Sequence, residues 1–173
     1  SLCVYHLLEF VLTAKYRPRE ATVHLFLIWG AKGSKEFYMA QSFGIFEYFV
    51  TSRGHSSNIW QLLGLALILC GQLLRSLAMI HCGDQFVQYV VTDTSENDRL
   101  VTNGVYGYFR HPLYVGFILL TLGQQVLLEN VICFIIACAV LYVFFLQRIR
   151  FEEYYLRKRF GLEYLEYLKR VVF

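Results

Sequence analysis

The sequence Arg110-His111-Pro112 is one of two groups of residues that indicate a binding site for a charged ligand. Proline is favoured as the first residue of a helix, and helical geometry is disfavoured for the residue before it. We therefore expect a helix to begin at Pro112, with His111 just outside it. The unpaired amides and the dipole of that first turn attract an anion, and Arg110 and His111 add donors. The alternative is an ordinary helix start with an arginine that reaches the membrane surface.

Arg148 and Glu152 are a second such group, four residues apart and therefore on one helix face. A plain surface pair would contribute only about 0.3–0.5 kcal/mol. However, arginine before glutamate is the less favourable order for such a pair, and both residues follow directly on an apolar run. Because ionisable groups are costly at the edge of a membrane, we predict a functional site here. Arg75, within another apolar run, is expected either to reach the surface or to contribute to the site.

The loop at residues 100–109 contains Gly104 and Gly107, which allow tight turns and a close approach of the backbone to a ligand. It carries neither the phosphate-loop signature nor the glycine pattern of dinucleotide-binding folds. The 5 cysteines form no C-x-x-C pair and no other metal-ligand spacing, so no metal site is predicted.

The composition is typical of a membrane protein. Of the 173 residues, 57% are hydrophobic and 17% are charged, whereas soluble domains average about 25% charged residues. The net charge of +3 does not imply a nucleic-acid partner, and the lipid bilayer is the expected environment. The length favours a single domain over residues 1–173. The chain opens inside an apolar stretch without an initiator methionine, so we expect further spans before it.

Several apolar segments approach the roughly 20 residues that a helix needs to cross a bilayer. We predict spans near residues 1–14, 35–50, 59–82, 112–128 and 131–147. Residues 21–29 are apolar but too short to cross, and are predicted to form an interfacial or re-entrant helix. Only Glu129 and Asn130 separate the last two spans, which predicts an antiparallel helix pair with Arg110 and Arg148 on one side of the membrane.

Basic residues gather on that side. Placing residues 15–35, 82–112 and 148–173 together leaves Arg53 as the one basic residue of the opposite loops. By the positive-inside rule the rich side is cytosolic, so we expect the site to face the cytosol.

Residues 148–173 form a tail in which apolar residues alternate with charges at helical spacing, and Gly161 is expected to end a helix. We predict two amphipathic helices that lie on the cytosolic face or fold back to it. The predicted fold is an all-α, multi-pass membrane bundle whose C-terminal helices close a cytosolic cofactor site.

Together these residues resemble the isoprenylcysteine carboxyl methyltransferase family. The matching segments are Leu100-Val101-Thr102-x-Gly104-Val105-Tyr106, Arg110-His111-Pro112-x-Tyr114-Val115-Gly116, Arg148-x-x-x-Glu152-Glu153 and Phe160-Gly161-x-Glu163-Tyr164-x-Glu166-Tyr167. Gly71-x-x-x-Arg75-x-x-Ala78-Met79 also fits. The Arg-His-Pro signature alone is shared with related membrane methyltransferases and sterol reductases, whereas the combined set is specific.

The resemblance implies methyl transfer from S-adenosylmethionine to the C-terminal carboxylate of a prenylated cysteine. The expected partners are prenylated proteins processed at a C-a-a-X terminus, such as small GTPases. The expected location is the endoplasmic reticulum membrane.

The resemblance also implies roles for single residues. By their match to the family motifs, the expected cofactor contacts are Asp98, Arg99, Leu100, Val101, Tyr106, His111, Pro112, Leu113, Tyr114 and Glu152. Arg148 matches the arginine that orients the substrate carboxylate. Arg148 and Glu152 are therefore the catalytic candidates, and Arg148 and Arg75 the substrate-binding ones. The chain departs from the family pattern at Val91, where relatives have a glutamine. Either that contact is missing here or Gln88 supplies it.

The reaction fits the inventory of side chains. A carboxylate nucleophile is already ionised at neutral pH, so no general base is needed. The protein has to align the reacting groups and exclude water, and an arginine is well suited to position a carboxylate. The prenyl chain is expected to enter sideways from the lipid while the cofactor arrives from the cytosol.

Two other functions are compatible with parts of the sequence. The first is an NADPH-dependent membrane sterol or lipid reductase, against which the Glu152-Glu153 pair argues. The second is a non-catalytic lipid-binding homologue, against which the intact set of Arg148, Glu152 and His111 argues.

Overall fold

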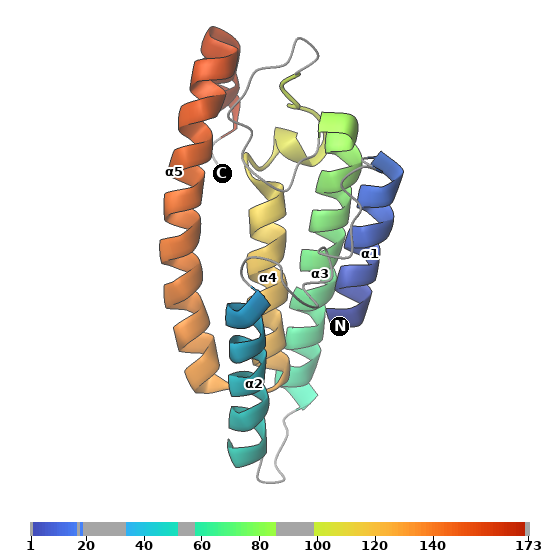
Figure 1. The fold of residues 1–173 in the computed structure, drawn as a ribbon, viewed down its shortest axis with the longest axis vertical. Helices are drawn as coiled ribbons and strands as arrows, with labels where there is room; N and C mark the ends of the chain where they lie inside the picture. The colour runs from blue at the N-terminus through green and yellow to red at the C-terminus, as the bar shows by residue number, and fades with distance from the viewer. Residues whose placement is uncertain (1, 17, 19–33, 52–57, 86–98, 172–173) are drawn as a thin grey trace.

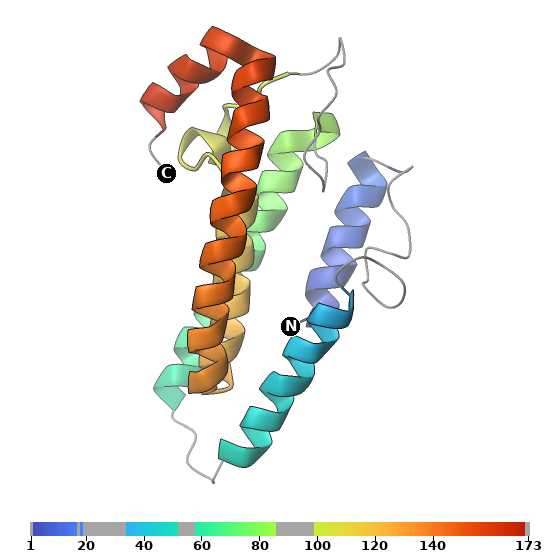
Figure 2. The same ribbon diagram turned by 60° about the vertical axis from the view of Figure 1, so that its left-hand side comes forward.

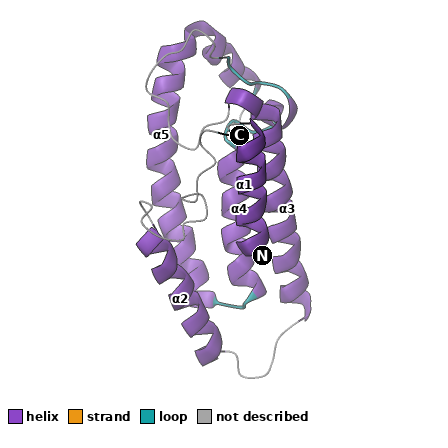
Figure 3. Ribbon diagram, turned by 45° about the vertical axis from the view of Figure 1, so that its right-hand side comes forward, coloured by secondary structure: helices purple, strands orange, loops and turns teal. Residues whose placement is uncertain are grey.

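A computed structural model describes residues 2–16, 18, 34–51, 58–85 and 99–171 of the chain. Every regular element in that part is helical (Figure 3). The elements are α1 (Leu2–Tyr16), α2 (Ser34–Thr51), α3 (Asn58–Cys82), the 3-10 turns η2 (Gly83–Gln85) and η3 (Gly104–Gly107), α4 (Pro112–Leu127) and α5 (Val131–Arg170). The predicted helix at 21–29, Arg53, Gln88, Val91 and the cofactor candidate Asp98 lie outside the described residues.

Glycines bring α3 and α4 into backbone contact. A Cβ atom added at Gly71 would lie 2.7 Å from the Gly116 carbonyl oxygen, and one added at Gly116 would lie 2.8 Å from that of Gly71. One heptad further along, Gly64 and Gly123 are equally crowded by the facing helix. Small residues of this kind are what permits helices to pack closely within lipid, where no hydrophobic effect drives them together. The two helices lie side by side along their lengths (Figure 1).

A tight turn joins α4 to α5. Leu128, Glu129 and Asn130 make up the connection, and Glu129 adopts a positive φ of 56°. The helix pair is antiparallel (Figure 1). The first turn of α5 is completed from another helix, because the Glu47 carboxylate of α2 accepts the amide protons of Ile132 and Cys133 at 2.8 and 2.7 Å. A carboxylate at this position satisfies unpaired donors and complements the helix dipole.

Helix α5 runs from Val131 through the predicted tail. The expectation of a separate first tail helix after Gln147 is wrong, because the apolar and amphipathic parts form one helix without a break there. The expected helix end at Gly161 is found as a kink, with φ 52° and ψ −119°. Glycine alone adopts such angles readily. Beyond the kink the last part of α5 folds back toward the η3 region (Figure 2).

Two helical stretches of the described part are long and apolar enough to cross a membrane, namely residues 58–85 and α5, and α4 is a shorter apolar helix. Large apolar side chains cover their outer faces, including Leu62, Leu69 and Ile135. Such a surface suits lipid contact. Which of the predicted segments cross the bilayer stays a prediction.

Candidate active site

Tyr114, in the first turn of α4, lies at the centre of the polar end of the bundle. Its hydroxyl donates a hydrogen bond of 2.5 Å to Glu152 Oε2 and accepts one of 2.9 Å from Arg148 Nε. The Arg148 guanidinium also lies 5.7 Å from the centre of the Tyr114 ring. Glu152 is thus joined to Arg148 through the tyrosine hydroxyl, and both bonds have a charged partner, which makes them strong.

His111 sits at the N-cap of α4, as the His-Pro sequence predicts, and stacks on the Tyr114 ring at 5.5 Å. Its Nδ1 and Nε2 atoms lie 3.5 Å from Glu152 and 3.7 Å from Glu153. Burial disfavours the charged imidazole, but the two carboxylates outweigh this effect and raise the pKa of His111 to about 8. The imidazole is therefore mostly protonated at neutral pH, between two carboxylates.

Arg110 is bound to the C-terminal end of the chain. Its Nε atom donates to the carbonyl of Val171 at 2.6 Å, and Nη2 donates to that of Leu168 at 3.1 Å. A cation at these carbonyls satisfies unpaired acceptors at the C-terminal end of α5. Arg110 therefore ties the folded-back tail to the start of α4, and a contact of its side chain with a bound anion stays a prediction.

The loop before α4 is held by the same tail. The Tyr167 hydroxyl donates to the carbonyl of Tyr106 at 2.7 Å, and Leu100 packs on the buried cluster of Tyr164, Tyr167 and Val171. Burial, with the nearby Cys82 thiol, raises the pKa of Tyr106, so its hydroxyl stays protonated. The loop that the sequence predicts to hold the cofactor is thus fixed between α4 and the end of α5.

Arg75 lies beside the first turn of α4 but forms its own buried cluster. Its Nε and Nη2 atoms bind the two carboxylate oxygens of Glu9 at 2.5 and 3.0 Å, and Nη1 donates to the Leu113 carbonyl at 3.0 Å. The rings of Tyr5 and Phe117 lie 5.5 and 5.8 Å from the guanidinium carbon. The ion pair joins α1 to α3, and the hydrogen bond to Leu113 joins α3 to α4. Substrate binding by Arg75 stays a prediction.

The structure brings together His111, Tyr114, Arg148 and Glu152, from helices that the sequence predicts to meet. Pro112 is buried at the start of α4. Arg99 is exposed, and its backbone amide donates to Gln85 at 3.2 Å. Sequence reasoning missed Glu9 and the contacts of Tyr167. An acidic residue inside the first apolar segment was the available signal for Glu9.

Comparisons with known proteins identify relatives of this chain. The profile of the isoprenylcysteine carboxyl methyltransferase family matches residues 63–158. The protein-S-isoprenylcysteine O-methyltransferase of Saccharomyces cerevisiae is 36% identical over 181 residues, covering 99% of this chain and 74% of the yeast protein. The human protein of the same name is 35% identical, with 99% of this chain and 61% of the human protein covered.

A solved structure has the same fold. The eukaryotic intramembrane Ras methyltransferase ICMT (isoprenylcysteine carboxyl methyltransferase) matches with a TM-score of 0.90 and 30% identity. The match covers 97% of this chain and 61% of that one, so the chain spans about three fifths of the solved relative. Because sequence and fold agree over nearly all of its length, the chain belongs to the isoprenylcysteine carboxyl methyltransferase family.

Proposed function

We propose that the site around Tyr114 methylates the C-terminal carboxylate of a prenylated cysteine, with S-adenosylmethionine as the methyl donor. The observation that carries the proposal is the hydrogen-bonded series Arg148–Tyr114–Glu152 at the polar end of apolar helices. Such a place gives a lipid-linked carboxylate access from the bilayer and a charged cofactor access from water. Family membership supports the reaction.

The residues present fit S-adenosylmethionine, which carries an anionic carboxylate and cationic amino and sulfonium groups. The site offers groups of both signs, in Arg148, His111 and Glu152. His111 Nε2 is moreover a buried atom without a hydrogen-bond partner in the described part of the chain, so a donor remains for a ligand. When bound, the cofactor supplies an electrophilic methyl group on a positively charged sulfur. His111, Tyr114 and Glu152 are the described polar residues proposed to hold it.

The residues of this chain contribute by positioning. Arg148 orients the substrate carboxylate, which needs no general base because it is ionised at neutral pH. The Tyr114 hydroxyl accepts a hydrogen bond from Arg148 Nε and donates one to Glu152. The guanidinium is therefore fixed before substrate arrives. Holding the reacting groups in a fixed geometry can supply a large part of the rate enhancement. The closed tail helps to exclude water.

Membrane association and prenylated protein substrates follow from the family, and we propose the finer assignments. The substrates are proteins with a processed C-a-a-X terminus, small GTPases among them. We place the enzyme in the endoplasmic reticulum membrane. We place its site on the cytosolic side, because the described basic residues Arg157, Lys158 and Arg159 of α5 lie at this end of the bundle.

The test is methyl transfer from labelled S-adenosylmethionine to N-acetyl-farnesylcysteine by the full-length protein in membranes. We expect Arg148→Ala and Glu152→Ala each to lower kcat/KM by about a hundredfold or more. The matched controls are Arg150→Ala and Glu163→Ala, which change exposed residues of the same helix and should leave turnover near the parent value.

If folded parent protein transfers no methyl group, the proposal is wrong and the non-catalytic lipid-binding alternative gains support. Competition between S-adenosylmethionine and NADPH for the protein separates the reductase alternative. If Arg148→Ala keeps full turnover, methylation occurs but the positioning role of Arg148 is wrong.

A further inference from the structure

The ion pair between Glu9 and Arg75 is a charged contact inside the apolar part of the bundle. The two side chains are largely buried, with 5% and 14% of their surfaces exposed, and they join helices that lie side by side (Figure 1). Two apolar residues of similar volume would hold α1 against α3 as well or better, because a buried ion pair loses its hydration. Packing therefore does not account for the charges, and an ionisable pair between apolar helices indicates a function.

Arg75 also reaches the backbone in the first turn of α4. Its Nη1 atom donates to the Leu113 carbonyl at 3.0 Å, and that carbonyl shares a rigid, planar peptide bond with the amide of Tyr114. On the other side of the same peptide, the Tyr114 amide donates to the His111 carbonyl at 3.0 Å. The peptide from which the Tyr114 side chain starts is thus fixed from two sides.

Tyr114 carries this restraint onward to Arg148. Its hydroxyl accepts from Arg148 Nε at 2.9 Å and donates to Glu152 at 2.5 Å. A shift of the peptide before Tyr114 would move the hydroxyl and, with it, the Arg148 guanidinium. Displacement of a reacting group by about 1 Å is enough to slow an enzyme by about a hundredfold, so the support behind Tyr114 matters for the rate.

Glu9 fixes the direction of the Arg75 side chain. Its two oxygens bind Nε and Nη2 at 2.5 and 3.0 Å, which is the paired geometry that orients an arginine most strictly. The base of Arg75 is also confined, because a Cβ added at Gly116 would lie 3.0 Å from the Arg75 Cβ and amide nitrogen. With the base and one edge of the guanidinium held, the Nη1 atom is directed at the Leu113 carbonyl.

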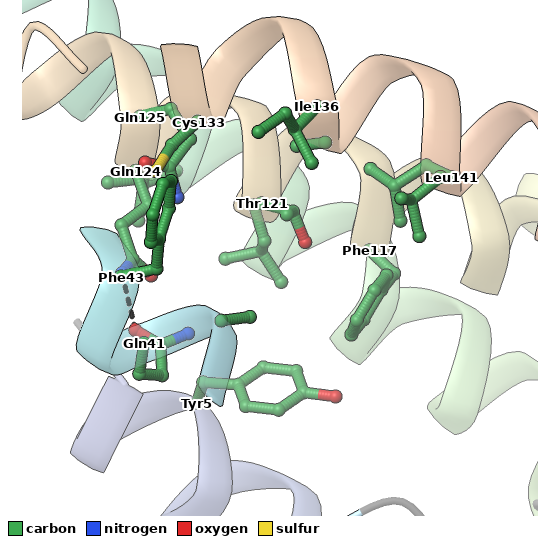
Figure 4. A pocket seen from close by; sticks show the side chains of 15 residues that line it. Tyr5, Gln41, Phe43, Phe117, Thr121, Gln124, Gln125, Cys133, Ile136 and Leu141 are labelled. Carbon is green, nitrogen blue, oxygen red and sulfur yellow. Dashed lines mark hydrogen bonds between the residues drawn. The ribbon is translucent and has the colours of Figure 1, made fainter. Parts of the chain in front are cut away.

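The surroundings of Arg75 favour action through α4 over contact with a substrate. The rings of Tyr5 and Phe117 lie 5.5 and 5.8 Å from its guanidinium carbon. Among the described residues, Tyr5 and Phe117 line a cavity of about 270 Å³ between α4 and α5 (Figure 4), whereas Arg75 does not. The Nε, Nη1 and Nη2 atoms of Arg75 all have protein partners. Its guanidinium is therefore committed to contacts within the protein.

We propose that Glu9 is a positioning residue for methyl transfer. It holds Arg75, and Arg75 fixes the peptide before Tyr114. Tyr114 in turn orients Arg148. The inference rests on the proposed function and adds a residue of α1, which lies 66 positions before Arg75 in the sequence. Because Glu9 and Arg75 touch neither substrate nor cofactor, their loss should lower kcat and leave KM unchanged.

The main experiment replaces the pair with apolar residues, in Glu9→Leu/Arg75→Met. This variant keeps the volume and avoids an unpaired buried charge, so its melting temperature in detergent should equal or exceed the parent value. The bond to Leu113 is lost, and we expect kcat for N-acetyl-farnesylcysteine to fall by about tenfold in membranes carrying the full-length protein. KM for that substrate and for S-adenosylmethionine should stay within about twofold of the parent value. A pair that only joined helices would leave kcat unchanged in a variant of parent stability.

A double-variant cycle with Tyr114→Phe tests the route. Tyr114→Phe already releases Arg148 from the tyrosine hydroxyl, so removal of the ion pair in that background should lower kcat by only about twofold. An equal fall in both backgrounds would mean that the pair does not act through Tyr114, and would overturn the inference.

Arg75→Lys keeps the inference testable if the apolar pair does not fold. Lysine keeps a positive charge for Glu9 but lacks the planar fork that reaches two partners on opposite sides. We expect kcat to fall by about threefold to tenfold with KM unchanged. Thr13→Val is the control for both variants, since it changes a fully buried residue on the same face of α1 and should leave kcat at the parent value.

The possible failures are distinguishable. If the parent protein methylates no substrate, the proposed function itself is wrong. If the parent is active and the apolar pair keeps both its melting temperature and its kcat, the ion pair has no part in the reaction and the inference is overturned. If KM for farnesylcysteine rises while kcat is unchanged, Arg75 binds the substrate directly and the positioning role is wrong. A fall in kcat alone, which is largely lost in the Tyr114→Phe background, supports the inference.

Discussion

Helix α4 has two unlike neighbours. Against α3 it packs backbone to backbone through Gly71 and Gly116, and any side chain larger than hydrogen there meets a main-chain atom. Against α5 it is held at its ends, by Tyr114 on one side and by the short turn at Asn130 on the other, with a cavity between. The difference shows how one bundle combines rigidity and space: α3 fixes the position of α4 through backbone contact, whereas a cavity remains on the α5 side.

The largest effect is expected from placing a side chain in the α3–α4 contact. Gly116→Leu would push a Cβ to 2.8 Å from the Gly71 carbonyl oxygen and the rest of the side chain into α3. We expect a loss of several kcal/mol and a clearly lower melting temperature. Thermal unfolding in detergent measures it. The control is Gly44→Ala, where a Cβ meets only side-chain atoms at 3.6 and 3.7 Å. An unchanged melting temperature for Gly116→Leu would mean that the two helices are not closely packed.

Glu9→Gln tests whether the ion pair with Arg75 holds α1 against the closely packed helices α3 and α4. Glu9 is 4% exposed and binds Arg75 through both oxygens, so removal of its charge leaves a buried cation uncompensated. The expected cost is about 3–5 kcal/mol. Thr13→Val is the control on the same face, because the Thr13 hydroxyl has no hydrogen-bond partner within the described residues. Equal melting temperatures for both variants would show that the ion pair contributes nothing.

Tyr114→Phe probes the α4–α5 side while leaving the α3 side intact. It removes two hydrogen bonds with charged partners and no apolar surface. We expect kcat/KM for farnesylcysteine to fall by about tenfold to a hundredfold, with little loss of stability. Tyr142→Phe, on the exposed outer face of α5, is the matched control. If both variants retain parent activity, the tyrosine hydroxyl does not position Arg148.

The smallest effect is a pH dependence centred on His111. Because its pKa is raised to about 8 in the folded protein, the charged form is favoured by folding. That stabilisation is fully present below about pH 6.5, the unfolded value, and is lost as the pH rises through about 8. A shift of this size corresponds to at most about 2 kcal/mol. The melting temperature of the parent protein should fall as the pH rises from 6 to 9. The melting temperature of His111→Gln should change less over the same range.

The residues that could be predicted are those that leave a local pattern. Hydropathy places α3, α4 and α5, the His-Pro sequence places the start of α4, and Gly161 marks the kink. The close meeting of His111, Arg148 and Glu152 follows from a two-residue break between apolar runs. The expected helix boundary at Gln147 is wrong. The composition changes there from apolar to amphipathic, but the hydrogen bonding of α5 continues.

Contacts between distant residues could not be predicted. Glu9 and Arg75 are 66 positions apart, and Glu47 and Cys133 are 86 apart. Each pair joins two helices that are predicted separately. The spacing of apolar residues does not determine how each helix is rotated about its axis, so it does not show which side chains meet. Arg110 binds backbone carbonyls, and such acceptors occur at every residue, so the sequence carries no sign of which ones are used.

Helix α4 is shorter than the hydrocarbon core of a typical bilayer is thick. Its 16 residues extend about 24 Å, whereas the hydrocarbon core of a typical bilayer measures about 30 Å. If α4 crosses the bilayer as predicted, the membrane thins around it or water reaches down to His111. Turnover should consequently be highest in vesicles of short-chain lipids and decline as acyl chains lengthen, so that the choice of lipid acts as a control on the enzyme.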